Sequence, residues 1–155
     1  MNERNRRHLS RQPGNSAWRT VIWNGCDAGD WCHEIEGADL LINLAGRSVN
    51  CRYNERNRRQ ILESRLRATE VLGRVIADAS RPPEIWMNAS TATIYRHALD
   101  RAMDEATGEP GGSEPDTPAA WRFSIEVATR WEQAFFAAAT PHTRRIALRS
   151  AMIAP

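Results

Sequence analysis

The sequence predicts an α/β fold with a doubly wound, mostly parallel sheet. Short apolar runs alternate along the 155 residues with longer segments of helical periodicity, and this alternation is typical of parallel strands joined by helical crossovers. Two of the runs, 39–46 and 84–91, end alike, because each passes through Asn into small residues. Ligands bind at the carboxyl ends of parallel strands, so these two ends form a candidate site. Ordinary strand-to-loop exits would give the same pattern.

The first half of the chain is expected to hold two strands and one short helix. Residues 1–7 form a polar N-terminal end, and one domain then runs over 8–155. Residues 18–23 are rich in β-formers and predict a strand. A short helix is expected at 31–36. The run at 39–44 is almost unbroken in its hydrophobicity, which predicts a strand buried on both faces.

The second half is expected to contain two long helices. The first begins after Asn54, a good N-cap, and places Ile61, Leu62 and Leu66 on one apolar face. The second is expected to bury a stripe that includes Trp121 and Trp131. The predicted elements are a helix over 55–79, a strand over 84–88, a turn or short helix over 91–99, an acidic Gly- and Pro-rich loop over 100–118, a helix over 119–139 and a strand over 144–149.

Composition excludes several classes of chemistry. The net charge is only +2, so neither a nucleic acid nor a membrane surface is an expected partner. All 21 basic residues are Arg, and a chain without Lys cannot form a Walker-type phosphate loop, a Schiff base or a Tyr-x-x-x-Lys pair. An Arg-rich stretch opens the first long helix, where an anionic ligand or plain solvation would explain it.

The three cysteines and the hydropathy indicate a cytoplasmic protein without a metal site. Cys26, Cys32 and Cys51 match no zinc spacing, so reduced structural thiols are expected. No apolar run approaches the roughly 20 residues of a membrane span, and the first residues hold no apolar signal core. Reduced thiols and the lack of a signal predict the cytoplasm.

Several segments together resemble one family of enzymes. They are Asn43–Val49, Ile61–Arg65 and Asn88–Tyr95, supported by Trp131-Glu132 and Leu148–Ser150. The family is the epimerase-like branch of the atypical extended short-chain dehydrogenases/reductases, often labelled nucleoside-diphosphate-sugar epimerases, and the likeness runs from about Leu9 to Ala151. The resemblance implies a Rossmann-like fold that binds NADP rather than NAD.

The resemblance also implies site residues. Ser10-Arg11 corresponds to the turn that receives the adenosine 2′-phosphate, a role that suits a planar, always-charged guanidinium. Ser90 would hold a substrate oxygen, and Tyr95 is the nearest phenol that could exchange a proton. The implied cofactor-binding residues are Ser10, Arg11, Leu44, Ala45, Gly46, Gln60, Arg65, Asn88 and Ala89. The implied catalytic residues are Ser90 and Tyr95.

The chain departs from the family pattern in three ways. Phe123 and Val127 stand at the positions of the Tyr-x-x-x-Lys pair, and neither can move a proton. The nine glycines form no G-x-G-x-x-G turn, and the residues before Leu9 are too few for a strand, turn and helix, which need about 30 residues. The sequence ends at the strand after the second helix. We therefore expect a partial NAD(P)-binding domain that lacks the first strand-turn-helix and the C-terminal substrate part.

Two hypotheses of different classes follow. The first is an NADP-binding, epimerase/dehydratase-like oxidoreductase domain that is incomplete and weakly active or inactive alone, with a small-molecule substrate that the sequence does not identify. The second is a non-catalytic interaction module derived from the same fold, in which uncovered sheet edges or apolar surface lead to self-association. An intact small enzyme that uses Ser90 and Tyr95 without a cofactor is a third reading.

Overall fold

The computed structural model describes residues 19–97, 100–115 and 117–151. Its centre is a parallel sheet with the strand order β1 (Leu40–Asn43), β2 (Ile85–Thr91) and β3 (Arg144–Ser150). Helix α1 (Glu55–Asp78) joins β1 to β2, and α2 (Ala119–Ala137) lies between β2 and β3. The short 3-10 helices η2 (Asp30–Glu34) and η3 (Ala92–Ile94) precede β1 and follow β2. The predicted α/β class with a parallel sheet is confirmed.

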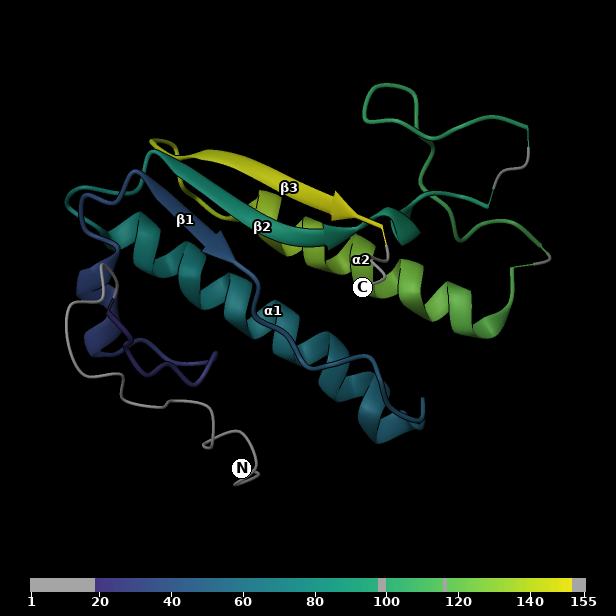
Figure 1. Cartoon of the computed structure of the whole chain (residues 1–155), viewed down its shortest axis with the longest axis horizontal. Helices are drawn as coiled ribbons and strands as arrows, with labels where there is room; N and C mark the ends of the chain where they lie inside the picture. Colours follow the sequence, from purple (N-terminus) through teal and green to yellow (C-terminus); the bar gives the residue numbers. More distant parts are fainter. Residues whose placement is uncertain (1–18, 98–99, 116, 152–155) are drawn as a thin grey trace.

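Both long helices pack on the same face of the sheet (Figure 1). Trp86 of β2 is completely buried between them, and its ring meets the ring of Phe135 of α2 edge to face, with 4.7 Å between the centroids. Val71 and Leu72 of α1 belong to the same cluster. Helix α1 begins where predicted, because the Asn54 side chain accepts a hydrogen bond from the Asn57 backbone N–H.

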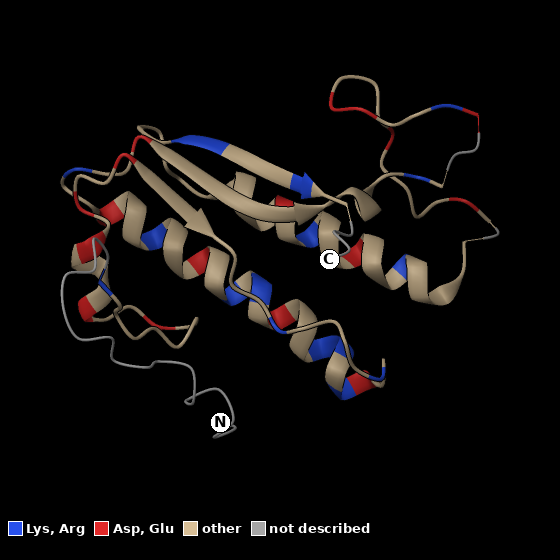
Figure 2. Ribbon diagram, in the orientation of Figure 1, with Lys and Arg blue, Asp and Glu red and all other residues tan. Residues whose placement is uncertain are grey.

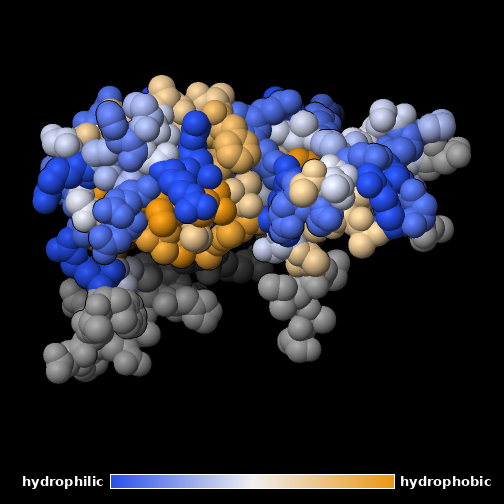
Figure 3. All heavy atoms as spheres, turned by 90° about the horizontal axis from the view of Figure 1, so that it is seen from above, coloured by the Kyte–Doolittle hydropathy of each residue, from blue (hydrophilic) through white to orange (hydrophobic). Residues whose placement is uncertain are grey.

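The opposite face of the sheet is apolar and open. Residues alternate along β2, so that Trp86, Asn88 and Ser90 are buried while their neighbours are half-exposed. On β1 the outward residues Leu40 and Ile42 are 43% and 51% exposed. The prediction that this strand is buried on both faces is therefore wrong, because within the described residues no helix covers its outer face. Hydrophobic side chains gather on the side of the molecule that Figure 3 shows.

Two further predictions need correction. Arg19–Trp23 forms no strand and pairs with none of the strands in the described part of the chain. Trp23 packs instead on Trp31 of η2 with 4.9 Å between ring centroids, while Ile22 stays 82% exposed. Trp121 is also not core: it lies in the first turn of α2, is 41% exposed and contacts His97 edge to face.

The remaining boundaries agree closely with the sequence. The short helix expected at 31–36 is η2, and β2 continues three residues beyond the predicted Asn88, to Thr91. The acidic stretch of 100–118 forms neither helix nor strand where the structure describes it, apart from one isolated bridge between Tyr95 and Pro110. None of the described helices is long and apolar enough to cross a membrane.

Candidate functional site

The candidate site lies at the carboxyl ends of the three strands, where β2 presents two buried polar side chains. Asn88 and Ser90 are two residues apart, so both point to the helix-covered face of the sheet. Each is the centre of a separate polar cluster. Figure 2 shows that β1 and β2 themselves carry no charged residue, whereas β3 and both long helices do.

The cluster around Asn88 is neutral and closed. Asn43 of β1 donates to the Asn88 side-chain oxygen at 2.7 Å, and Thr69 of α1 lies 3.4 Å from the same oxygen. Trp131 of α2 donates its ring N–H to the Thr69 hydroxyl at 2.9 Å, and Asn88 donates its own amide to the Ala89 carbonyl. The exposed fractions of Asn43, Thr69 and Asn88 are 2% or less. The cluster therefore ties two strands to two helices.

The cluster around Ser90 contains a charge pair. The Ser90 hydroxyl donates to Glu132 Oε1 of α2 at 2.5 Å. Arg149 of β3 donates two parallel hydrogen bonds to the same carboxylate, from Nε to Oε1 at 2.8 Å and from Nη2 to Oε2 at 2.7 Å. The remaining guanidinium nitrogen, Arg149 Nη1, donates to the Tyr95 phenol oxygen at 2.8 Å. The fold thus brings both predicted catalytic residues, Ser90 and Tyr95, into one hydrogen-bonded network with Glu132 and Arg149.

The electrostatics of this hydrogen-bonded network favour the ionised forms of Glu132 and Arg149. Burial by itself would raise the pKa of Glu132, but the hydrogen bonds from Arg149 and Ser90 outweigh it and hold the pKa below its ordinary value. The hydrogen bond to Glu132 raises the pKa of Arg149 above its already high value. Both groups are therefore charged at neutral pH, and Glu132 is only 6% exposed.

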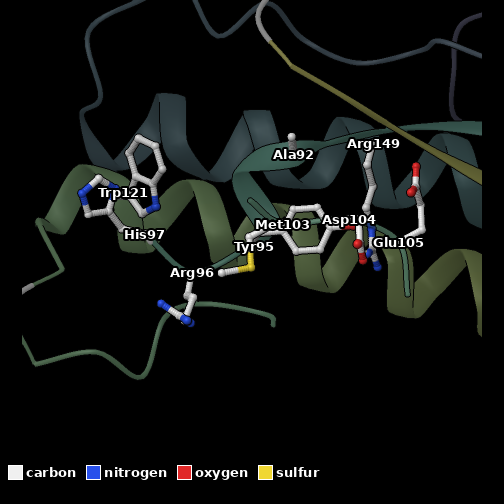
Figure 4. Close-up of a pocket in the computed structure, with 9 residues that line it drawn as sticks. All are labelled: Ala92, Tyr95, Arg96, His97, Met103, Asp104, Glu105, Trp121 and Arg149. Atoms are coloured by element: carbon white, nitrogen blue, oxygen red, sulfur yellow. The ribbon is translucent and has the colours of Figure 1, made fainter. Parts of the chain in front are cut away.

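A pocket of about 410 Å³ opens beside this hydrogen-bonded network. Tyr95 and Arg149 lie on its wall, and Trp121 with His97 lies at the opposite end (Figure 4). Arg96 also lines the pocket, but it is paired with Asp100 and Glu109 on the acidic loop. The pocket is large enough for a small molecule, and Tyr95 and Arg149 are the members of the Ser90 cluster that border it.

The predicted cofactor segment follows β1. Ala45 is fixed by a hydrogen bond from its N–H to the Asn43 side chain, and Leu44 is 73% exposed. Gly46 packs on Arg65 of α1, because a Cβ at this position would lie 3.2 Å from the guanidinium carbon. Leu44 and Ala45 line an open groove of about 570 Å³ along the free edge of β1.

Arg65 is a half-buried cation without a carboxylate. Its Nη1 donates to the carbonyls of Ile61 and Arg47 at 2.9 and 3.1 Å, and its guanidinium lies 5.1 Å from the Trp131 ring centroid. None of the ion pairs within the described ranges includes Arg65. Burial lowers its pKa. The predicted cofactor residue Gln60 lies one turn earlier and accepts a hydrogen bond from the Arg47 guanidinium.

The structure separates the remaining predicted residues into three groups. Ser10 and Arg11 lie outside the described residues. Ala89 is half-exposed on the outer face of β2, whereas Asn88 has its side chain turned inward, where both its oxygen and its NH2 group are hydrogen-bonded. Phe123 and Val127 are buried with Ile61, so the positions of the usual proton-transfer pair are occupied by core.

Sequence reasoning missed Glu132 and Arg149 as site residues, although both lay in segments that resembled the family. One observation could have found them. Glu132 interrupts the apolar stripe of α2 between Ala128 and Phe135, and a carboxylate on a buried stripe requires a buried partner. Among the described residues, no group of three or more His, Cys, Asp or Glu side chains is placed to hold a metal ion.

Comparisons with known proteins show which proteins the chain resembles. No family model matches it. The epimerase family protein SDR39U1 of Mus musculus is 29% identical over 150 residues, which cover 94% of this chain and 45% of that protein. The crystal structure of human epimerase family protein SDR39U1 with NADPH matches 77% of this chain and 39% of that one, with a TM-score of 0.63 and 28% identity. The nucleoside-diphosphate sugar epimerase of Corynebacterium glutamicum matches 83% of this chain and 24% of its own, with a TM-score of 0.59 and 25% identity.

These matches and the parallel three-stranded sheet show that the chain is a Rossmann-like α/β domain. More particularly, the chain belongs to the epimerase-like short-chain dehydrogenase/reductase superfamily, an NAD(P)-binding group, as its sequence motifs predicted. The chain spans less than half the length of the SDR39U1 relatives that it matches.

Proposed function

We propose that this chain binds NADP(H) at the carboxyl edge of the sheet and forms the cofactor half of an epimerase- or dehydratase-like oxidoreductase site. The observation that carries the proposal is Arg65, a half-buried cation beneath Gly46 that, among the described residues, donates to two backbone carbonyls, lies over the Trp131 ring and pairs with no carboxylate. A dinucleotide pyrophosphate supplies the negative charge that this position lacks. The human relative whose structure contains NADPH has the same fold over the matched region.

The residues present fit such a cofactor. Leu44, Ala45 and Gly46 are small or exposed and would lie under the adenosine and pyrophosphate, while Arg65 would face the phosphates and Ser90 and Tyr95 the nicotinamide end. A bound nicotinamide supplies hydride transfer. Arg11, beside Ser10, would select NADP over NAD by binding the 2′-phosphate. Without a Gly-rich turn in these residues and with Phe123 and Val127 in place of Tyr and Lys, we expect weak activity or none from the chain alone.

Isothermal titration with NADPH tests the proposal. We expect micromolar to submillimolar binding, and Arg65→Gln should weaken it by roughly tenfold or more, because a charge-assisted hydrogen bond contributes about 1.5–3 kcal/mol. Arg67→Gln is the matched control: Arg67 is exposed on the same helix, and its ion pair within the described ranges is with Glu63. Arg11→Ala should reduce the preference for NADPH over NADH. The absence of heat up to millimolar NADPH would contradict the proposal.

A second candidate function, a non-catalytic interaction module, is favoured by one observation. Leu40 and Ile42 on the outer face of β1, and Leu44 just after the strand, are 43–73% exposed, and parallel sheets usually bury both faces. Here the open sheet face would bind a second copy of the chain. Size-exclusion chromatography with light scattering should then show a dimer that Ile42→Glu dissociates, whereas Val49→Glu, at an equally exposed loop position, leaves it intact. A monomer at high concentration would rule this candidate out.

A further inference from the structure

The Ser90 cluster places a cation beside the phenol of Tyr95 by a route that differs from a Tyr-x-x-x-Lys pair. The chain contains no Lys, and the residue four positions after Tyr95 is Leu99. Nevertheless Arg149, which lies 54 positions further along the chain, donates a hydrogen bond to the Tyr95 oxygen at 2.8 Å. The guanidinium carbon also lies 5.0 Å from the centroid of the Tyr95 ring.

Arg149 is held in this position by neighbours that leave it little freedom. Its Nε and Nη2 both bind the carboxylate of Glu132, which fixes the plane of the guanidinium. Glu132 is in turn fixed by the hydroxyl of Ser90, and both of these residues are more than 90% buried. The Nη1 group that meets Tyr95 therefore points in a direction that β2, α2 and β3 together determine.

The contact constrains the proton of Tyr95. A phenol has one O–H donor and two acceptor lone pairs, and a guanidinium can only donate. Since Arg149 occupies a lone pair of the phenol oxygen, the proton of Tyr95 cannot point toward Arg149 and must point elsewhere. Tyr95 borders the pocket of about 410 Å³, whose lining also includes Asp104 and Glu105, so a ligand oxygen in that pocket can accept this proton.

We propose that Arg149, held by Glu132, is a positioning residue that takes the place of the lysine and directs the proton of Tyr95 toward the substrate. The inference rests on the proposed function, because it assumes that a carbonyl or hydroxyl substrate lies at this end of the site. In the proton transfer, the O–H bond of Tyr95 breaks as a new O–H bond forms on a substrate oxygen that gains negative charge. The phenolate left on Tyr95 is stabilised by the Arg149 N–H and recovers its proton from solvent.

The reactivity of the phenol tests this proposal without a known substrate. An aryl sulfonyl fluoride reacts with tyrosine by attack of the phenol oxygen on sulfur; the S–F bond breaks, fluoride leaves and the phenol proton passes to the buffer. The chain has only two tyrosines, Tyr53 and Tyr95. In the full chain we expect Tyr95 to be labelled faster than Tyr53, as measured by peptide mass spectrometry, because an adjacent donor stabilises the developing phenolate.

The direction of the mutant effect separates positioning from a structural role. Arg149→Gln should lower the labelling rate of Tyr95 by at least tenfold and leave Tyr53 unchanged, while Arg149→Lys should keep part of the rate because it keeps the charge. Glu132→Gln should give an intermediate loss, since it releases the guanidinium. If Arg149 only stabilises the fold, its removal exposes Tyr95 and the labelling rate rises instead.

Two results would overturn the inference: labelling of Tyr95 no faster than of Tyr53 in the unmutated chain, or a rate in Arg149→Gln equal to or above that of the unmutated chain. Titration with NADPH keeps this test separate from the proposed function. Arg149→Gln acts at the Tyr95 end of the site, so any loss of NADPH affinity should be smaller than the loss in Arg65→Gln, which removes the cation beside Gly46. If the unmutated chain does not bind NADPH, the proposed function is contradicted. The labelling rates still test whether Arg149 positions the proton of Tyr95.

Discussion

The two polar clusters on β2 begin from nearly the same local sequence and end with different properties. Asn88 and Ser90 lie on the same face of the same strand, both more than 90% buried. The Asn88 cluster is neutral, and its partners come from β1, α1 and α2. The Ser90 cluster contains a charge pair and borders a pocket through Tyr95 and Arg149. A small polar residue at a strand end is therefore insufficient to distinguish a structural cluster from a functional one.

Energetics explain why the charged cluster is the candidate for function. A neutral hydrogen-bonded cluster costs little to bury, and each satisfied bond contributes roughly 1 kcal/mol. A buried ion pair must first be desolvated, and an apolar replacement of similar volume is often as stable or more stable. The Glu132–Arg149 pair is thus poorly explained by stability alone, whereas a role in directing the Tyr95 proton gives a reason for its charge.

Among variants of the two clusters, Glu132→Gln is expected to have the largest effect on stability. Removing one charge of the pair leaves Arg149, whose side chain is 29% exposed, without its counter-ion. We expect a loss of about 3 kcal/mol in the free energy of unfolding, measured by urea denaturation. Glu126→Gln on the same helix is the control: its pair with Arg130 is more than half exposed on the carboxylate side, so its loss should stay below about 0.5 kcal/mol. Equal losses in the two variants would mean that the buried pair contributes no more to stability than the exposed pair.

The neutral cluster should show a somewhat smaller effect. Asn88→Ala removes the oxygen that Asn43 and Thr69 contact, and leaves the buried NH2 group of Asn43 with one long hydrogen bond, to Thr69. We expect a loss of about 2 kcal/mol that does not change between pH 5 and 8, because no member of the cluster titrates there. Asn50→Ala, at an exposed loop position, should change stability by less than about 0.5 kcal/mol. A loss in Asn88→Ala that varies across this pH range would show that the two clusters are coupled.

Much of the fold could be predicted from the sequence, since it depends on local patterns. The cap at Asn54, the apolar face of α1 and the apolar run of β2 are each determined by neighbouring residues. The strand expected at 18–23 failed for a non-local reason: β-propensity specifies an extended segment but not a partner, and Trp23 found burial on Trp31 instead.

The site was predictable only in part, for the same physical reason. Ser90 and Tyr95 were identified through a resemblance, and their positions near the end of β2 and just after η3 are local properties. Their partners are not local, because Glu132 and Arg149 lie 42 and 54 residues away along the chain and meet them only through the order of the three strands. The closed character of the Asn88 cluster depends likewise on Thr69 and Trp131, which no pattern around Asn88 specifies.

Acid should weaken the charged cluster selectively. The pKa of Glu132 is lower in the folded chain than in the unfolded chain, where it is about 4.3. Its contribution to stability is therefore fully present above that value and is lost as the pH falls through the folded pKa. Exposed carboxylates with lowered pKa values, such as Glu109, add to the acid sensitivity of the whole chain. We expect the stability difference between the unmutated chain and Glu132→Gln to shrink as the pH falls below about 4, and a constant difference would contradict this account.

The smallest effect is expected for Ser90→Ala, and it locates where the charged cluster is held. Ser90 donates one hydrogen bond to Glu132 Oε1, which also accepts from Arg149, so the carboxylate keeps two strong bonds when the hydroxyl is removed. We expect a loss of about 1 kcal/mol, compared with less than about 0.5 kcal/mol for Ser124→Ala, whose hydroxyl donates an exposed hydrogen bond to the Ala120 carbonyl of its own helix. The labelling rate of Tyr95 should remain within about twofold of the unmutated value. If Ser90→Ala lowers that rate as far as Arg149→Gln does, Ser90 rather than the bidentate pair fixes the guanidinium, and the position of Tyr95 depends on β2 instead of α2.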